Sequence, residues 1–136
     1  MMAVLKQYPP NFKMIHKKLS PPPGTIFCYG PIIYNPDGVH LDYPLIAHEE
    51  VHCRQQGESP DLWWRRYIAD IPFRLSQEIP AYQIQYREGR KILKDRNKLA
   101  GWLSRLATEL SGATYGNMMS YADAYKAISR DELYLF

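Results

Sequence analysis

Two histidines stand one helical turn apart in the stretch "HEEVH", residues 48 to 52. Successive residues of a helix advance by about 100°, so His48 and His52 would lie about 40° apart around the axis. Both imidazoles could then reach one ion, and Glu49 would lie about 60° beyond His52, beside the ion rather than on it. Glu50 would point about 200° away from His48. The spacing predicts a zinc site in which Glu49 is the neighbouring carboxylate.

A zinc ion needs a third protein ligand, because two hold it too weakly. Glu78 is the leading candidate, 26 residues after His52. That length allows the chain to leave, turn and return as a second helix antiparallel to the first. Pro80 frees the local backbone, and the small Ala81 allows two helices to approach closely. Asp70 is the next candidate for the third ligand.

Together these stretches resemble the zinc-binding pattern of the gluzincin metallopeptidases. "HEEVH" from His48, "EIPAY" from Glu78 and "YGNM" from residue 115 are similar to small uncharacterised metallopeptidases of phages and bacteria. The resemblance implies that His48, His52 and Glu78 bind one Zn²⁺. It also implies that Glu49 activates a zinc-bound water to hydrolyse a peptide or amide bond. A zincin-like fold would place a hairpin before the active-site helix and lay the substrate along an edge strand there.

Peptide hydrolysis also needs a donor for the developing oxyanion. Tyr82 is the first candidate, because it follows Glu78 by four residues and falls on nearly the same helical face. It stands where several gluzincin families carry an aspartate, so their usual partner for the histidines is missing. The next candidate donors are Tyr115, Tyr86 and Arg54.

The pattern of hydrophobic residues and turn formers predicts an α+β fold, mainly helical, in one domain over residues 1–136. Residues 1–24 are expected to form an irregular arm that ends in "SPPPG". A strand is predicted over 25–30, followed by a hairpin in which 32–34 and 39–41 flank "NPDG".

Capping residues predict where the helices begin and end. Asp42 is expected to cap the helix that carries the histidines, and Gly57 to end it. A second helix is predicted to start at residue 60, and prolines predict kinks or restarts near 70–72 and 77–80. Later helices are predicted to run to the mid-90s, from about 92 to Gly112, and from Ser120 to Ser129.

Composition narrows the class of protein. Hydrophobic residues make up 46% and charged residues 23%, which is typical of a globular domain. The net charge of +3 is too small, and the basic residues too scattered, to indicate nucleic-acid binding.

No apolar stretch approaches the ~20 residues of a membrane span. The start of the chain lacks the apolar segment of a signal peptide, which predicts a cytoplasmic protein, with phage origin as one setting. Cys28 and Cys53 are accordingly expected to be free thiols.

The leading interpretation is a zinc metallopeptidase that acts on a peptide or protein substrate, with a shallow, open site because the chain is short. The first rival is a protein of the same fold in which zinc staples two helices without catalysis, or which binds a partner, for instance within a phage particle.

A di-iron carboxylate protein is rejected, because it would need a second Glu-x-x-His unit. His16 and His40 stand alone and are interpreted as structural. Oligomeric state is left open.

Overall fold

The computed structural model describes residues 2–133, which form an α+β domain of six α-helices, one short 3-10 helix and a small sheet. The strands are β1 (Ala3–Leu5), β2 (Phe27–Tyr29) and β3 (Ile32–Tyr34). The helices are α1 (Phe12–Leu19), α2 (Tyr43–Gln56), α3 (Pro60–Ala69), α4 (Ile71–Ile92), α5 (Arg96–Leu110), η1 (Ala113–Tyr115) and α6 (Tyr121–Ser129). The predicted fold class is confirmed. None of the described helices is long and apolar enough to cross a membrane.

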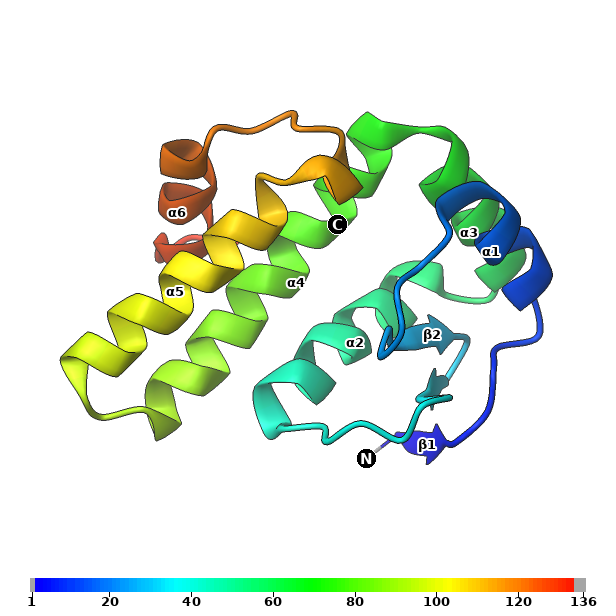
Figure 1. Cartoon of the computed structure of the whole chain (residues 1–136), viewed down its shortest axis with the longest axis horizontal. Helices are drawn as coiled ribbons and strands as arrows, with labels where there is room; N and C mark the ends of the chain where they lie inside the picture. The colour runs from blue at the N-terminus through cyan, green and yellow to red at the C-terminus, as the bar shows by residue number, and fades with distance from the viewer. Residues whose placement is uncertain (1, 134–136) are drawn as a thin grey trace.

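Helices α2 and α4 lie side by side in the middle of the molecule (Figure 1). On one side α4 packs with α5 and α6 around a cluster of buried residues. On the other side α1, α3 and the sheet enclose a second cluster, which is rich in aromatic rings. The α2–α4 pair therefore runs between two separate hydrophobic cores.

The sheet has the order β1-β3-β2, with β1 parallel and β2 antiparallel to β3. The prediction of an irregular arm over 1–24 is wrong, because this segment contains β1 and the amphipathic helix α1, whose Ile15 is buried. Alternation in three-residue strands is too short a pattern to detect, and β1 is stabilised by pairing with a strand far along the chain.

The predicted hairpin is also corrected. Strand β3 pairs with β2 through a turn at Gly30, and residues 39–41 form no strand. The edge of β3 that 39–41 would need is taken by β1. In addition, the Asn35 side chain bonds both the N–H and the carbonyl of Val39, at 3.0 and 2.8 Å, and so closes a loop that leads into α2.

Helix α2 begins and ends as predicted. The Asp42 carboxylate accepts from the Leu45 N–H at 2.9 Å, and Gly57 ends the helix with a φ of 56°. Asp70 then ends α3 and caps α4, accepting from the Phe73 N–H at 3.0 Å. The restart predicted near 70–72 is confirmed, and Asp70 acts as a cap.

Near 77–80 the helix does not restart, because α4 continues through Pro80 to Ile92. Proline removes one backbone donor, but α4 packs against α2, α5 and α6, and this packing outweighs the lost bond. Gly89 also leaves the helix unbroken. A Cβ on Gly89 would lie 2.1 Å from the ring of Trp102, so glycine is needed for the close approach of α5.

This contact predicts that Gly89→Ala destabilises the protein by about 1–3 kcal/mol, because the indole is stacked on Tyr86 and has to be displaced. Gly101→Ala is the matched control, since a Cβ there meets no atom within 4 Å, and it should stabilise α5 by about 0.5–1 kcal/mol. Urea unfolding of the two variants measures both effects. Equal stability of the two variants would contradict the close packing at Gly89.

Candidate metal centre

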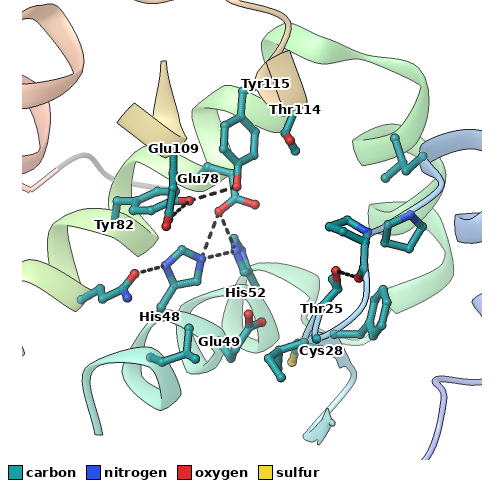
Figure 2. Close-up of a pocket in the computed structure, with 18 of the residues that line it drawn as sticks. Thr25, Cys28, His48, Glu49, His52, Glu78, Tyr82, Glu109, Thr114 and Tyr115 are labelled. Atoms are coloured by element: carbon teal, nitrogen blue, oxygen red, sulfur yellow. Dashed lines mark hydrogen bonds and ion pairs between the residues drawn. The ribbon is translucent and has the colours of Figure 1, made fainter. Parts of the chain in front are cut away.

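His48 and His52 on α2 meet Glu78 on α4 at one buried point (Figure 2). The Glu78 Oε1 atom lies 3.1 Å from His48 Nε2 and 3.0 Å from His52 Nε2, and the two Nε2 atoms are 3.2 Å apart. The three residues are only 7%, 5% and 4% exposed. The structure brings together the three residues predicted as ligands, as a group that could hold a metal ion.

Helix α4 returns antiparallel to α2, as predicted. His48 contacts Gln85 near the far end of the pairing, and His52 contacts Glu78 seven residues earlier on α4. Further along α2, Gln55 donates to the carbonyl of Gln77 at 2.9 Å. These bonds set the register of the two helices around the centre.

Two glutamines determine which imidazole nitrogen faces the centre. The Gln85 Oε1 atom lies 2.9 Å from His48 Nδ1, and Gln55 Oε1 lies 2.9 Å from His52 Nδ1. Gln55 is oriented by the bond that its NH₂ group donates to α4. An amide oxygen only accepts, so each Nδ1 carries the proton and each Nε2 points a lone pair at the centre.

The centre therefore gathers three acceptor atoms, two imidazole nitrogens and a carboxylate oxygen of Glu78. Their lone pairs repel one another unless a proton or a cation lies between them. Ligands held about 2.0–2.1 Å from a tetrahedral zinc ion lie about 3.3 Å apart, close to the separations of 3.0 to 3.2 Å found here. Nitrogen and carboxylate donors are also those that zinc accepts. The residues fit a zinc ion.

Tyr67 on α3 orients the third member of the group. Its hydroxyl donates to Glu78 Oε2 at 2.5 Å, which leaves Oε1 for the centre. Tyr67 is buried in the aromatic core as well as bonded to Glu78. Its second role carries no local signal, since it depends on the angle between α3 and α4. Gln85 could have been found, because it follows Glu78 by two helical turns on the same face.

The buried Arg74 side chain links the end of α3 to η1. Its guanidinium donates to the carbonyls of Tyr67 and Ile68 at 2.8 and 2.9 Å, and to the carbonyl of Thr114 at 2.8 Å. The first two bonds satisfy the end of α3, and the third ties down the short helix η1. Arg74 thereby fixes the backbone that carries Tyr67 and places Tyr115 beside the centre.

Glu49 lies on α2 at the wall of a cavity that also borders the three candidate ligands. It is 7% exposed, and burial is the main cause that raises its pKa. His48 and His52 lower the pKa and Glu78 raises it again, so that the result stays above the usual value for a glutamate. A raised pKa makes this carboxylate a stronger base than an exposed glutamate. Glu50 is half-buried and does not line the cavity.

Tyr82 packs edge-on against the ring of His48, with the centroids 4.8 Å apart. The Tyr82 hydroxyl donates to Glu109 Oε2 at 3.1 Å, and the Tyr115 hydroxyl lies 3.2 Å from the Tyr82 hydroxyl. A carboxylate only accepts, so Tyr82 gives its proton to Glu109 and Tyr115 donates to Tyr82. Burial, helped by nearby carboxylates, raises the pKa of both tyrosines well above the usual value, so both keep their protons.

The two other candidate donors lie away from the cavity. Tyr86 is buried in the α4–α5 core, stacked on Trp102 at 6.1 Å. Arg54 is exposed on α2 and does not line the cavity. Of the predicted donors, the structure therefore brings Tyr82 and Tyr115 to the centre.

The cavity above the centre has a volume of about 640 Å³. One wall comes from α1, the segment 21–28 and α3, and the opposite wall from α5 and Tyr115. The segment expected to be an irregular arm thus supplies one side of the site. A volume of this size is in the range of sites that bind small molecules or short peptides.

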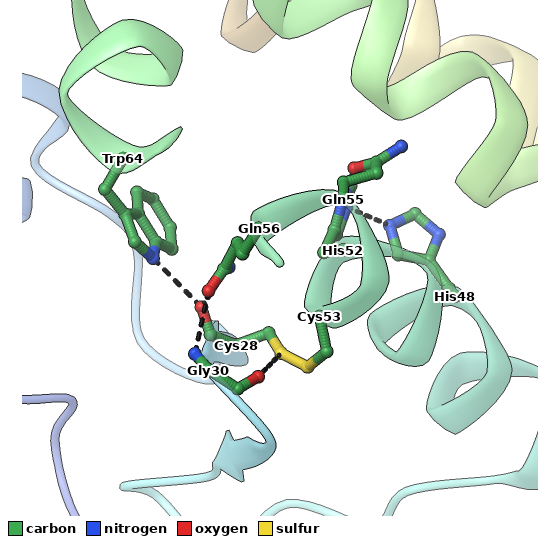
Figure 3. Close-up of a disulfide and its surroundings, with 8 residues drawn as sticks. All are labelled: Cys28, Gly30, His48, His52, Cys53, Gln55, Gln56 and Trp64. Atoms are coloured by element: carbon green, nitrogen blue, oxygen red, sulfur yellow. Dashed lines mark hydrogen bonds between the residues drawn. A yellow bond between two sulfur atoms is a disulfide. The ribbon is translucent and has the colours of Figure 1, made fainter. Parts of the chain in front are cut away.

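Strand β2 is an edge strand of the sheet, and it is tied to α2 by a disulfide between Cys28 and Cys53 (Figure 3). The prediction of two free thiols is wrong. The sequence predicts the strand that carries Cys28, but it does not show that this strand packs on α2 beside Cys53. The outcome is a covalent link directly after His52.

Side chains of α2 and α3 also hold the outer edge of β2. The Cys28 carbonyl accepts from Gln56 Nε2 at 2.7 Å and from Trp64 Nε1 at 2.9 Å, while Gln56 Oε1 accepts from the Gly30 N–H at 2.8 Å. An edge strand therefore lies beside the candidate centre, as the resemblance implies. At Cys28, however, its carbonyl is already bonded within the protein.

Comparison with protein-family models, with curated proteins and with solved structures finds no match to this chain. The structure itself shows a mainly helical protein with a buried group of three residues that could hold a metal ion: His48, His52 and Glu78. The two histidines lie one turn apart on a helix.

The centre predicts that a rise in pH destabilises the metal-free protein and increases the stabilisation that added zinc provides. Burial lowers the pKa of His52, but attraction and hydrogen bonding to Glu78 outweigh it and raise the pKa from 6.5 to about 9. The same pairing outweighs burial and lowers the pKa of Glu78. Without metal, the stabilisation by protonated His52 is complete below about pH 6.5 and is lost as the pH rises through about 9. The melting temperature of the metal-free protein should fall over that range.

Zinc competes with protons for the imidazoles, so the rise in melting temperature on adding zinc should grow over the same range. At about 100 times its Kd, zinc contributes about 2.7 kcal/mol, or about 8 °C for a chain of this size. Thermal unfolding at several pH values, with zinc or with chelator, measures both trends. His52→Gln should abolish both. A metal-free melting temperature that stays constant between pH 6.5 and 9 would contradict the coupling.

Proposed function

We propose that this chain is a zinc-dependent metallopeptidase that hydrolyses a peptide or amide bond. His48, His52 and Glu78 hold the ion, and Glu49 is the general base. The observation that carries the proposal is the convergence of three acceptor atoms at one buried point beside a carboxyl group of raised pKa, all bordering one cavity. The resemblance of "HEEVH" and "EIPAY" to gluzincins supports the same assignment.

Zinc held by three protein ligands supplies a Lewis acid that polarises a carbonyl group and acidifies water. Glu49 takes a proton from the attacking water while the water oxygen bonds to the carbonyl carbon. It then gives that proton to the leaving amine as the C–N bond breaks. Burial suits Glu49 to this work, because its raised pKa lets one group act first as base and then as acid.

A hydroxyl group near the centre would stabilise the oxyanion that develops on the substrate. Tyr82 is placed for this by its contact with His48, but it must first turn its proton away from Glu109. Tyr115 is the alternative donor, and its hydroxyl would have to turn away from Tyr82. Both hydroxyls stay protonated, as a donor must.

The rival proposal is a zinc staple between α2 and α4 that has no catalytic role. The low exposure of the three ligands, 4% to 7%, favours it. A structural zinc site, however, is closed by four protein ligands, whereas three ligands that border a cavity leave a position for substrate. The staple would also give no reason for a buried Glu49 beside it. We therefore favour the enzyme over a structural or particle-binding protein.

The substrate is proposed to be a peptide or protein, with no role for nucleic acid. The Cys28–Cys53 disulfide bears on where the protein works. Disulfides persist in oxidising environments and are rare in the cytosol. We propose that the enzyme acts in an oxidising setting, rather than in the cytoplasm as the sequence predicts.

The proposal predicts that Glu49→Gln still binds zinc but loses activity by about 10²–10⁴-fold, because the general base is removed while the ligands remain. Glu50→Gln is the matched control, one residue further on the same helix with its side chain outside the cavity, and it should cleave normally. The measurement is cleavage of a mixed peptide library by zinc-loaded protein, read by mass spectrometry.

Full activity in Glu49→Gln would remove Glu49 from the mechanism. Zinc bound by the wild type with no cleavage of any peptide would favour the staple.

A further inference from the structure

Glu109 on α5 is an exposed carboxylate in the wall of the cavity that faces α1 and α3. Its Oε2 atom accepts from the Tyr82 hydroxyl at 3.1 Å, and the Tyr82 ring packs against His48 at 4.8 Å. One tyrosine side chain therefore separates Glu109 from the candidate metal centre. The sequence gives Glu109 no role, because α5 is far from the histidine motif along the chain.

Glu109 forms no ion pair within 4.0 Å among residues 2–133. Arg105 lies one turn earlier on α5 and also lines the cavity, but it is not within 4.0 Å of the Glu109 carboxylate. The bond from Tyr82 orients the carboxylate without neutralising it, because a hydroxyl is uncharged. A cation in the cavity would therefore meet a carboxylate in the wall that has no ion-pair partner within 4.0 Å.

We infer that Glu109 binds the ammonium group of the substrate, so that the cavity selects peptides whose free amino terminus lies next to the cleaved bond. This inference rests on the proposed function and gives it a substrate class. An extended residue spans about 3.5 Å, so the amino terminus of a peptide whose first bond lies at the centre would also lie in the cavity that Glu109 lines. A charge-assisted bond to an ammonium is about twice as strong as a neutral one.

Arg105 raises the opposite possibility, that the cavity selects a free carboxylate. Two observations favour Glu109. It is bonded to Tyr82, which in turn contacts a ligand, whereas no bond among the described residues links Arg105 to the centre. The two residues have opposite charges on one face of one helix, so matched probes can separate them.

The test is isothermal calorimetry with three zinc-binding hydroxamates that share the leucine hydroxamate core and carry groups of different charge on the amino nitrogen. Leucine hydroxamate carries an ammonium, N-acetyl-leucine hydroxamate is neutral, and N-succinyl-leucine hydroxamate carries a carboxylate. The zinc-loaded wild type should bind the ammonium compound about tenfold more tightly than the acetyl compound, which corresponds to about 1.4 kcal/mol. In Glu109→Gln this ratio should fall to about one, and in Arg105→Gln it should persist.

The control for each variant is its zinc content and melting temperature, which should match those of the wild type. Equal binding of the ammonium and acetyl compounds by the wild type would overturn the inference but leave the metallopeptidase standing. Tightest binding of the succinyl compound, lost in Arg105→Gln, would overturn it in favour of a carboxylate. If zinc is bound but none of the three hydroxamates binds, the site has no position for substrate, and the proposed function fails together with the inference.

Discussion

Three lone pairs meet at one buried point between α2 and α4, from two imidazoles and from one oxygen of Glu78. Their mutual repulsion has to be offset, and much of the surrounding structure serves to hold them there. Gln55 and Gln85 hold the protons of the histidines on the outer nitrogens. Tyr67 occupies the second oxygen of the carboxylate. With every outward position bonded, the inward atoms can be satisfied only by a cation or by a proton.

The same constraint links the centre to the two hydrophobic cores. Tyr67 belongs to the aromatic core on the α3 side, and Tyr82 to the core around α5 and α6. Each core thus places one tyrosine beside the centre. Arg74 links the two sides, because it donates hydrogen bonds to carbonyls of α3 and of the short helix η1. Movement of either core would displace a hydroxyl group at the site. Packing and chemistry are therefore coupled through these side chains.

The parts of the site that could be predicted from the sequence are those that depend on helical periodicity. His48, Glu49 and His52 follow from the spacing within one helix, and Glu78 follows from a second helix that must return beside it. The caps at Asp42 and Gly57 are equally local, and they bound α2 as expected.

The errors have a common physical origin, which is pairing between segments far apart in the chain. Strand β1 takes the edge of β3 where the hairpin of 39–41 was expected. Cys28 meets Cys53 only because β2 packs on α2. Tyr67 reaches Glu78 across the angle between two helices, and Pro80 is held in a continuous helix by packing on both sides. None of these contacts can be recognised from the sequence of a single segment.

Zinc content per chain tests the central claim most directly. Protein freed of metal, given zinc and then cleared of excess should retain about one zinc per chain in the wild type. Asp70→Ala, which removes a helix cap rather than a ligand, should retain the same amount, and Glu78→Ala should retain clearly less. A wild type that retains no zinc after this treatment would contradict the account and leave two hydrogen-bonded histidines at a helix–helix contact.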